Sequence, residues 1–171
     1  LVIPMVNTRQ EAEKAVAACK YPPQGVRGIG CGRGGNYGRS FMQNLHNAND
    51  NVLVCVQIEH IDAVNNIDEI AGVQGIDVLF VGPFDLSASM GLIGQTAAPE
   101  VLECIDRVIR AGKKHGVPVG MFCRDEEHTA QMLAKGMQFI SYTEDKNLLN
   151  AACDASIAKL RSLMGKMEIT F

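Results

Sequence analysis

Apolar runs alternate along the chain with segments in which apolar residues recur every three or four positions. The short runs are rich in Val and Ile and apolar on both faces, a pattern typical of strands buried in a parallel sheet. We expect strands at residues 1–6, 52–58, 76–81, 117–123 and 137–142. The segments with helical spacing predict helices at residues 11–20, 41–48, 63–71, 99–115, 126–135 and 146–164. Each predicted strand is followed by a helix, which places the chain in the α/β class.

Two closures of the sheet satisfy this alternation, an open doubly wound sheet and a (β/α)8 barrel. The first apolar run opens at Leu1, in the middle of a predicted strand, so we expect that an N-terminal part is missing. Five strand–helix units would then be the C-terminal five of the eight units of a parallel TIM-type barrel. The sequence contains no tandem repeat and no low-complexity linker, which predicts a single domain.

The composition argues against several functional classes. The 171 residues are 47% hydrophobic and 20% charged, with a net charge of −3. This balance argues against nucleic-acid binding and against a basic membrane-binding patch. No apolar run approaches the roughly 18 residues of a membrane span, and we find no secretory signal. None of the six cysteines belongs to a CxxC pair, so we expect reduced thiols in a cytoplasmic protein.

The candidate chemistry lies where two successive predicted strands end. Gln57 and Glu59 are two residues apart, so they share one face at the carboxyl end of the strand at 52–58. Asp85 follows the next predicted strand, just after a Gly-Pro turn. Active sites of α/β proteins are built at the carboxyl ends of parallel strands. Neighbouring strands would therefore bring both carboxylates to the same rim.

Two carboxylates from adjacent strand ends suit a hard divalent cation such as Mg²⁺ or Mn²⁺. With two protein ligands, most coordination positions stay open for water and for substrate oxygens. The alternative is structural: Asp85 caps a short helix that begins at Leu86, and Glu59 forms an ion pair. The pattern alone leaves both interpretations open.

Several motifs in a fixed order carry a resemblance to a known family. They read V-Q-I-E at 56–59, A-V-N-N-I-D-E-I at 63–70 and G-I-D-V-L-F-V-G-P-F-D-L-S at 75–87. Upstream stand I-P-M-V at 3–6, Y-P-P-Q-G-V-R-G-I-G at 21–30 and A-N-D at 48–50. Together they resemble the HpcH/HpaI aldolase/citrate lyase family, and within it the class II, metal-dependent pyruvate aldolases. The similarity weakens after about Thr143.

The resemblance implies a fold and an assembly. Residues 1–171 would form a single, partial aldolase domain with the (β/α)8 barrel fold. The chain would assemble as a homohexamer with swapped C-terminal helices. The implied reaction is the cleavage of 4-hydroxy-2-oxo acids to pyruvate and an aldehyde through a metal-stabilised enolate.

The resemblance also implies roles for individual residues. Glu59 and Asp85 would hold a divalent cation, which is Mg²⁺, Mn²⁺ or Co²⁺. Gln57 would lie in the substrate pocket. The carboxylate of a 2-oxo acid such as pyruvate or oxaloacetate would be received by the backbone at Gly82, Pro83 and Phe84.

The family also uses a catalytic His, an Asp partner and an Arg, which the resemblance places before Leu1. The catalytic residues therefore stay unassigned, and the chain's four histidines do not match the family's catalytic His: His46, His60, His115 and His128. Two alternatives stay open beside the aldolase. One is an acyl-CoA lyase of the citrate lyase β type, which shares the strand-end Glu and Asp but needs a basic groove for CoA. The other is a truncated, non-catalytic relative that joins an oligomer.

Overall fold

The structure is a computed structural model that describes residues 1–165. Its five strands form one sheet in which every neighbouring pair is parallel. The strands are β1 (Val2–Ile3), β2 (Cys55–Ile58), β3 (Val78–Val81), β4 (Val119–Cys123) and β5 (Phe139–Tyr142). They lie side by side in the order in which they occur in the chain.

This strand order decides between the two closures that the sequence left open. A doubly wound sheet reverses its strand order at a switch point. In the wall of a barrel, each strand pairs with the strand that precedes it in the chain. The order β1-β2-β3-β4-β5 is that of a barrel wall. The prediction of TIM-type strand–helix units is therefore confirmed.

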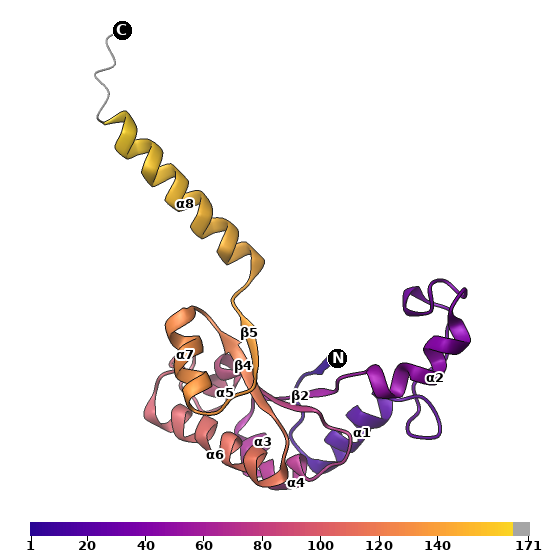
Figure 1. Ribbon diagram of the computed structural model, residues 1–171. Coiled ribbons are helices and arrows are strands. Elements are labelled where there is room, and N and C mark those ends of the chain that lie inside the picture. Colours follow the sequence, from indigo (N-terminus) through magenta and orange to yellow (C-terminus); the bar gives the residue numbers. More distant parts are fainter. Residues whose placement is uncertain (166–171) are drawn as a thin grey trace.

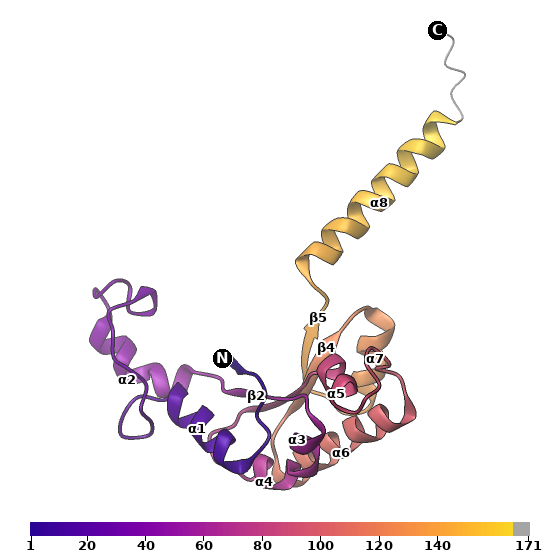
Figure 2. The same cartoon turned by 180° about the vertical axis from the view of Figure 1, so that it is seen from behind.

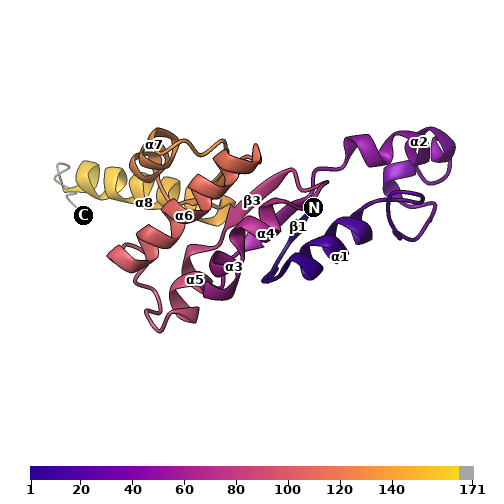
Figure 3. The ribbon, with the colours of Figure 1, turned by 90° about the horizontal axis from the view of Figure 1, so that it is seen from below.

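Helices connect the strands and follow one another across the molecule from α1 through α4 to α6 and α7 (Figure 3). They are α1 (Arg9–Cys19), α2 (Phe41–Asn51), α3 (Ile61–Asn65), α4 (Ile67–Ala71), α5 (Pro83–Ser89), α6 (Pro99–His115), α7 (Glu126–Ala134) and α8 (Asp145–Met164). A short 3-10 helix, η1 (Arg33–Gly35), lies between α1 and α2.

Local sequence signals explain where the helices begin and end. Thr8 and Glu11 form a capping box that starts α1. Pro99 occupies the first turn of α6, and Gly116 ends that helix with a φ of 70°. The helix predicted at 63–71 is instead two short helices that meet at Asn66. The Asn66 side chain donates a hydrogen bond to the backbone oxygen of Asn7 over 2.8 Å, which anchors this break.

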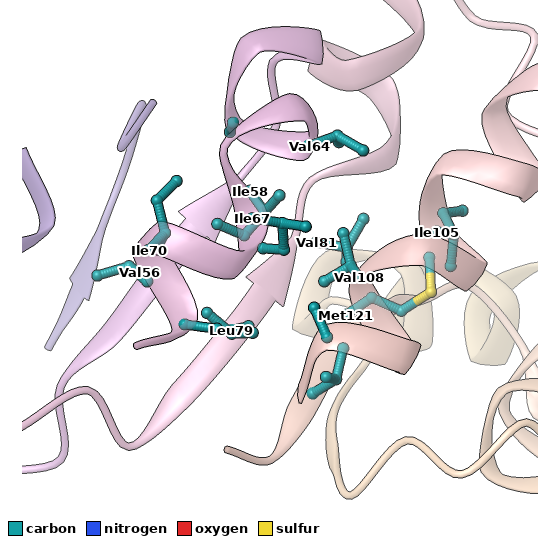
Figure 4. Close-up of a cluster of buried hydrophobic side chains, with 14 of the residues drawn as sticks. Val56, Ile58, Val64, Ile67, Ile70, Leu79, Val81, Ile105, Val108 and Met121 are labelled. Atoms are coloured by element: carbon teal, nitrogen blue, oxygen red, sulfur yellow. The ribbon is translucent and has the colours of Figure 1, made fainter. Parts of the chain in front are cut away.

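One continuous core lies between the sheet and the helices that cover its outer face (Figure 4). Strand residues Val56, Ile58, Leu79, Val81 and Met121 meet residues of α3, α4 and α6 there. Burying each such side chain stabilises the fold by roughly 1.5–3 kcal/mol. The residues between them in the strands, such as Gln57, Phe80 and Phe122, are only partly buried. They line the opposite, inner face of the sheet.

Strand β1 is shorter than predicted. The expected strand covered residues 1–6, whereas only Val2 and Ile3 pair with β2. The reason lies two residues after the strand, where Met5 adopts a φ of 54° and turns the chain away from the sheet. An apolar run therefore predicts a buried segment more reliably than it predicts the length of a strand.

Two helical segments project from the body in different directions (Figures 1 and 2). Neither α2 nor α8 contains a buried residue. The family resemblance implies that the last helix is exchanged between subunits. Within residues 1–165, α8 does not pack on the barrel wall of its own chain.

Of the helices in the described part of the chain, none has the length and hydrophobicity needed to cross a membrane.

Candidate active site

The ends of the first three strands meet at one point on the rim of the sheet. Glu59 directly follows β2, and Gly82 directly follows β3. The Gly82 N–H donates a hydrogen bond to the backbone oxygen of Ile58 over 3.2 Å, which locks the two strand ends side by side. Met5 follows β1 by two residues and reaches the same place. This is the carboxyl end of the sheet, as the sequence predicts.

Glu59 is a buried carboxylate, with 4% of its surface exposed. Its Oε1 accepts a hydrogen bond from the Met5 N–H over 2.8 Å. Its Oε2 accepts a hydrogen bond from the Gln57 side-chain Nε2 over 2.9 Å. The structure therefore brings Gln57 and Glu59 together on one face, as their two-residue spacing predicts. Each carboxylate oxygen has one protein donor and keeps further acceptor capacity.

Gly82 leaves the space that this carboxylate occupies. A Cβ atom on Gly82 would lie 2.6 Å from Glu59 Oε2 and 2.8 Å from Glu59 Cβ. Both distances are far below van der Waals contact. The position therefore requires glycine for as long as Glu59 keeps this conformation.

Met5 presents its amide to Glu59 from an unusual backbone conformation. Its φ of 54° lies in the left-handed region, which residues other than Gly, Asn and Asp seldom adopt. The Met5 side chain is half exposed and does not enter the core. The turn therefore serves the backbone N–H, and such strain is typical of functional sites.

Asp85 lies in the first turn of α5, which begins immediately after Gly82. Its side chain is exposed. Gly82 is the residue that precedes the first turn, so the alternative that Asp85 caps the helix is wrong. Leu86 makes the first backbone hydrogen bond of this helix, to the Gly82 oxygen over 2.9 Å. Pro83 has no N–H, and the amides of Phe84 and Asp85 have no partner within the helix.

The second part of the structural alternative also fails for the described residues. Within residues 1–165, no Lys, Arg or His side chain forms a salt bridge with Glu59. Burying a carboxylate is costly unless a positive charge or a metal ion compensates it. Within the described residues, Glu59 is thus a buried acid with two hydrogen-bond donors and no counter-charge.

The donor set fits a hard divalent cation. No group of three or more His, Cys, Asp or Glu side chains gathers in the described part of the chain. The two carboxylates that the sequence predicts as ligands follow neighbouring strands, Glu59 directly after β2 and Asp85 in the first turn of α5 after β3. Mg²⁺ is commonly held in this way, by one or two carboxylates with waters or substrate oxygens in the remaining positions.

Other polar groups near the rim have structural roles. His60 begins α3, where its Nδ1 accepts a hydrogen bond from the Asp62 N–H over 3.1 Å. Tyr142 donates to Glu126 Oε1 over 2.9 Å, and this bond raises the pKa of the Tyr142 hydroxyl. A hollow of about 580 Å³ lies near Val117 and Gly136, where strands β4 and β5 begin. It is at the wrong end of the sheet for Glu59.

Sequence reasoning missed the part played by Met5. Left-handed turns are predicted from Gly, Asn or Asp, and methionine gives no such signal. It also assigned Gly82 to substrate binding alone, because the clash with Glu59 depends on the register between β2 and β3. The sequence could have offered one clue, which is that Pro4 interrupts the apolar run directly before Met5.

Comparisons with known proteins show which family the chain resembles. Residues 1–152 match the family model described as HpcH/HpaI aldolase/citrate lyase. The chain is 35% identical over 151 residues to the 5-keto-4-deoxy-D-glucarate aldolase of Shigella dysenteriae serotype 1 (strain Sd197). That alignment covers 88% of this chain and 59% of the aldolase.

Solved structures give the same result. An HpcH/HpaI aldolase/citrate lyase family protein from Burkholderia cenocepacia J2315 superposes with a TM-score of 0.88 at 34% identity. The superposition covers 94% of this chain and 64% of that protein. The citrate synthase SbnG superposes with a TM-score of 0.80 at 27% identity, covering 97% of this chain and 64% of the synthase.

The chain thus spans 59% of the length of the curated aldolase that it matches. The family match runs over residues 1–152 and includes β1 to β5, Glu59 and Asp85. On this basis, the chain belongs to the HpcH/HpaI aldolase/citrate lyase family.

Proposed function

We propose that this chain carries the metal-binding half of the active site of a class II aldolase. The substrate would be a 4-hydroxy-2-oxo acid, cleaved to pyruvate and an aldehyde. The observation that carries the proposal is the Glu59 carboxylate, which is buried at the carboxyl end of the sheet and has no salt-bridge partner among residues 1–165. Kinship with an aldolase that acts on 5-keto-4-deoxy-D-glucarate, itself a 2-oxo acid by chemical class, supports it.

The residues at the carboxyl end of the sheet have different roles in this proposal. Glu59 and Asp85 would hold the cation, which is Mg²⁺, Mn²⁺ or Co²⁺. When bound, such a cation acts as a Lewis acid that stabilises negative charge developing on the substrate's keto oxygen. The amide of Phe84 at the start of α5 would receive the substrate carboxylate, and Gly82 and Pro83 shape the turn that exposes it. Gln57 holds one oxygen of Glu59 and borders the substrate.

The resemblance assigns the acid–base chemistry to a His, an Asp and an Arg that have no match in this chain. The four histidines lie elsewhere: His46 is in α2, His60 starts α3, His115 ends α6 and His128 is in α7. We therefore assign no residue here as the catalytic acid or base.

A sharp test is the decarboxylation of oxaloacetate, a reaction that needs the cation and the carboxylate cradle. The chain should turn over oxaloacetate with Mn²⁺ and lose this activity with a chelator. Glu59→Gln and Asp85→Asn should abolish it, because each removes a charged ligand. The matched control is Glu69→Gln, an exposed carboxylate on α4. Mn²⁺-dependent turnover that survives Glu59→Gln would refute the assignment.

A second candidate is an acyl-CoA lyase of the citrate lyase β type. The likeness to a citrate synthase favours keeping it. Cleavage that depends on acetyl-CoA would support this candidate over the aldolase. A folded sample that binds Mn²⁺ but turns over neither substrate would favour the non-catalytic relative.

We also propose that the chain forms a homo-oligomer through α8. Its side chains include Leu149, 64% exposed, and Leu160, 59% exposed. An unpaired amphipathic helix of 20 residues gains little stability alone in water. The family resemblance implies the partner, which is the barrel of a second copy.

A further inference from the structure

The three groups around Glu59 lie on different strand ends and act on one carboxylate. Met5, after β1, contacts Oε1 through its backbone N–H. Gln57, on β2, contacts Oε2 through its side chain. Gly82, after β3, provides the space beside Oε2. The carboxylate is thus confined by its neighbours before any ligand arrives.

Each confinement has a separate physical basis. The Met5 N–H is a fixed donor, because it belongs to a backbone turn rather than to a flexible side chain. At Gly82 the constraint is steric, since a methyl group there would collide with both Oε2 and Cβ of Glu59. The collision cannot be relieved by rotating the end of the side chain alone, because Glu59 Cβ is fixed to the backbone.

We propose that Gly82 and the left-handed backbone of Met5 are positioning residues that hold the Glu59 carboxylate in place for the divalent cation. This inference rests on the proposed function. It gives Gly82 a role that is separate from the substrate cradle, because it acts through Glu59 and in the absence of substrate. Groups that orient a metal ligand typically affect metal affinity by 10- to 100-fold when they are changed.

The first experiment measures Mn²⁺ binding by electron paramagnetic resonance in the full chain, without substrate. Gly82→Ala should weaken Mn²⁺ binding roughly 10- to 100-fold. The matched control is Gly34→Ala, where the nearest atoms to a new Cβ are 3.9 Å away in the Asn44 side chain. Gly34→Ala should bind Mn²⁺ like the wild type.

A double-variant cycle separates a role through Glu59 from a general disturbance. In a Glu59→Gln background, Gly82→Ala should cause no further loss of Mn²⁺ affinity, because the group on which it acts is already neutral. Additive losses in the two variants would show that Gly82 acts independently of Glu59 and would overturn the inference.

A pair of substitutions at Met5 keeps the test decisive if Gly82→Ala does not fold. Met5→Gly retains the N–H and adopts a positive φ without strain, so Mn²⁺ affinity should match the wild type. Met5→Val places a β-branched residue in a conformation that it strongly disfavours, so affinity should fall. Equal affinity in both variants would overturn the role of the Met5 backbone.

Hydrogen exchange of the Met5 amide, followed by NMR, gives a readout that needs no metal. The amide should be protected in the wild type and in Gly34→Ala, and should exchange faster in Gly82→Ala. Mn²⁺ affinity that is equal in the wild type and in Gly82→Ala would overturn the inference and leave the proposed function standing. A wild type that does not bind Mn²⁺ would overturn both.

Discussion

Two regions of this chain carry rows of apolar side chains and use them in different ways. In the core, Leu79 lies at 0% exposure between the sheet and its helices. On α8, Leu160 is 59% exposed, and no residue of that helix is buried. Both segments show the spacing of their secondary structure. The comparison teaches that an apolar pattern predicts an element and its apolar face, but not whether the chain's own core covers that face.

The largest expected effect comes from making the same substitution in both regions. Leu79→Ala should lower the free energy of unfolding by about 2–5 kcal/mol, because it leaves a cavity in packed surroundings. Leu160→Ala should change it by about 0.5 kcal/mol or less in a dilute, unassembled sample, because the side chain is already in water. Urea unfolding of both variants measures the difference. Similar losses in the two variants would mean that α8 packs on its own barrel in solution.

Introducing negative charges on α8 should change stability less than the core substitution does. It should clearly change the oligomeric state. Leu149→Asp combined with Leu160→Asp should shift the protein to a smaller species in size-exclusion chromatography with light scattering. Two buried carboxylates without partners would oppose association. Asn150→Asp is the matched control, since it adds one charge at a polar position of the same helix. An unchanged mass in the double variant would contradict the proposed oligomer.

The smallest effect concerns α1, which is packed along one face and exposed at its first turn. Thr8→Ala should cost about 1 kcal/mol, because Thr8 Oγ1 accepts the Glu11 N–H over 3.2 Å. Chemical unfolding at neutral pH measures this cost. Substituting the exposed Arg9 with alanine should cost less, since it removes a surface ion pair with Glu13 rather than a cap.

The same cap has a pH signature with a defined sign. A backbone hydrogen bond from Asn7 holds the pKa of Glu11 below its ordinary value. The cap therefore stabilises the fold fully above the unfolded pKa of about 4.3, and this contribution is lost as the pH falls through the lowered folded pKa. Glu11→Gln should flatten that part of the pH–stability profile. An unchanged profile in Glu11→Gln would contradict the cap.

The sequence predicts the elements of this fold well where local signals are strong. Helix α6 has the predicted bounds, because Pro99 marks its first turn and Gly116 ends it. The sequence does not predict the break at Asn66. A hydrogen bond to a loop more than fifty residues away in the sequence accompanies the division of one expected helix into two. Strand β1 is shorter than the apolar run predicts, because Met5 turns the chain away from the sheet and methionine carries no local signal for such a turn.

The candidate site also has one part that the sequence predicts and one part that it does not. Gln57, Glu59 and Asp85 could be picked out from their spacing and from the strand ends that they follow. The sequence could not choose between a metal site and a structural pair, because that choice depends on what surrounds Glu59. Among the described residues Glu59 is buried without a salt bridge, and Asp85 lies inside α5 rather than at its cap, so neither part of the structural alternative holds.

By itself, the sequence determined the parallel α/β class, the succession of strand–helix units, the family and the two carboxylates of the candidate site. Tertiary structure alone decided that the strands follow barrel order, that Glu59 is buried, and that Met5 and Gly82 confine its carboxylate. The physical reason is the distance along the sequence over which each signal acts. Periodicity and helix caps depend on a few neighbouring residues. The surroundings of the Glu59 carboxylate combine residues 5, 59 and 82, which only the register of three strands brings together.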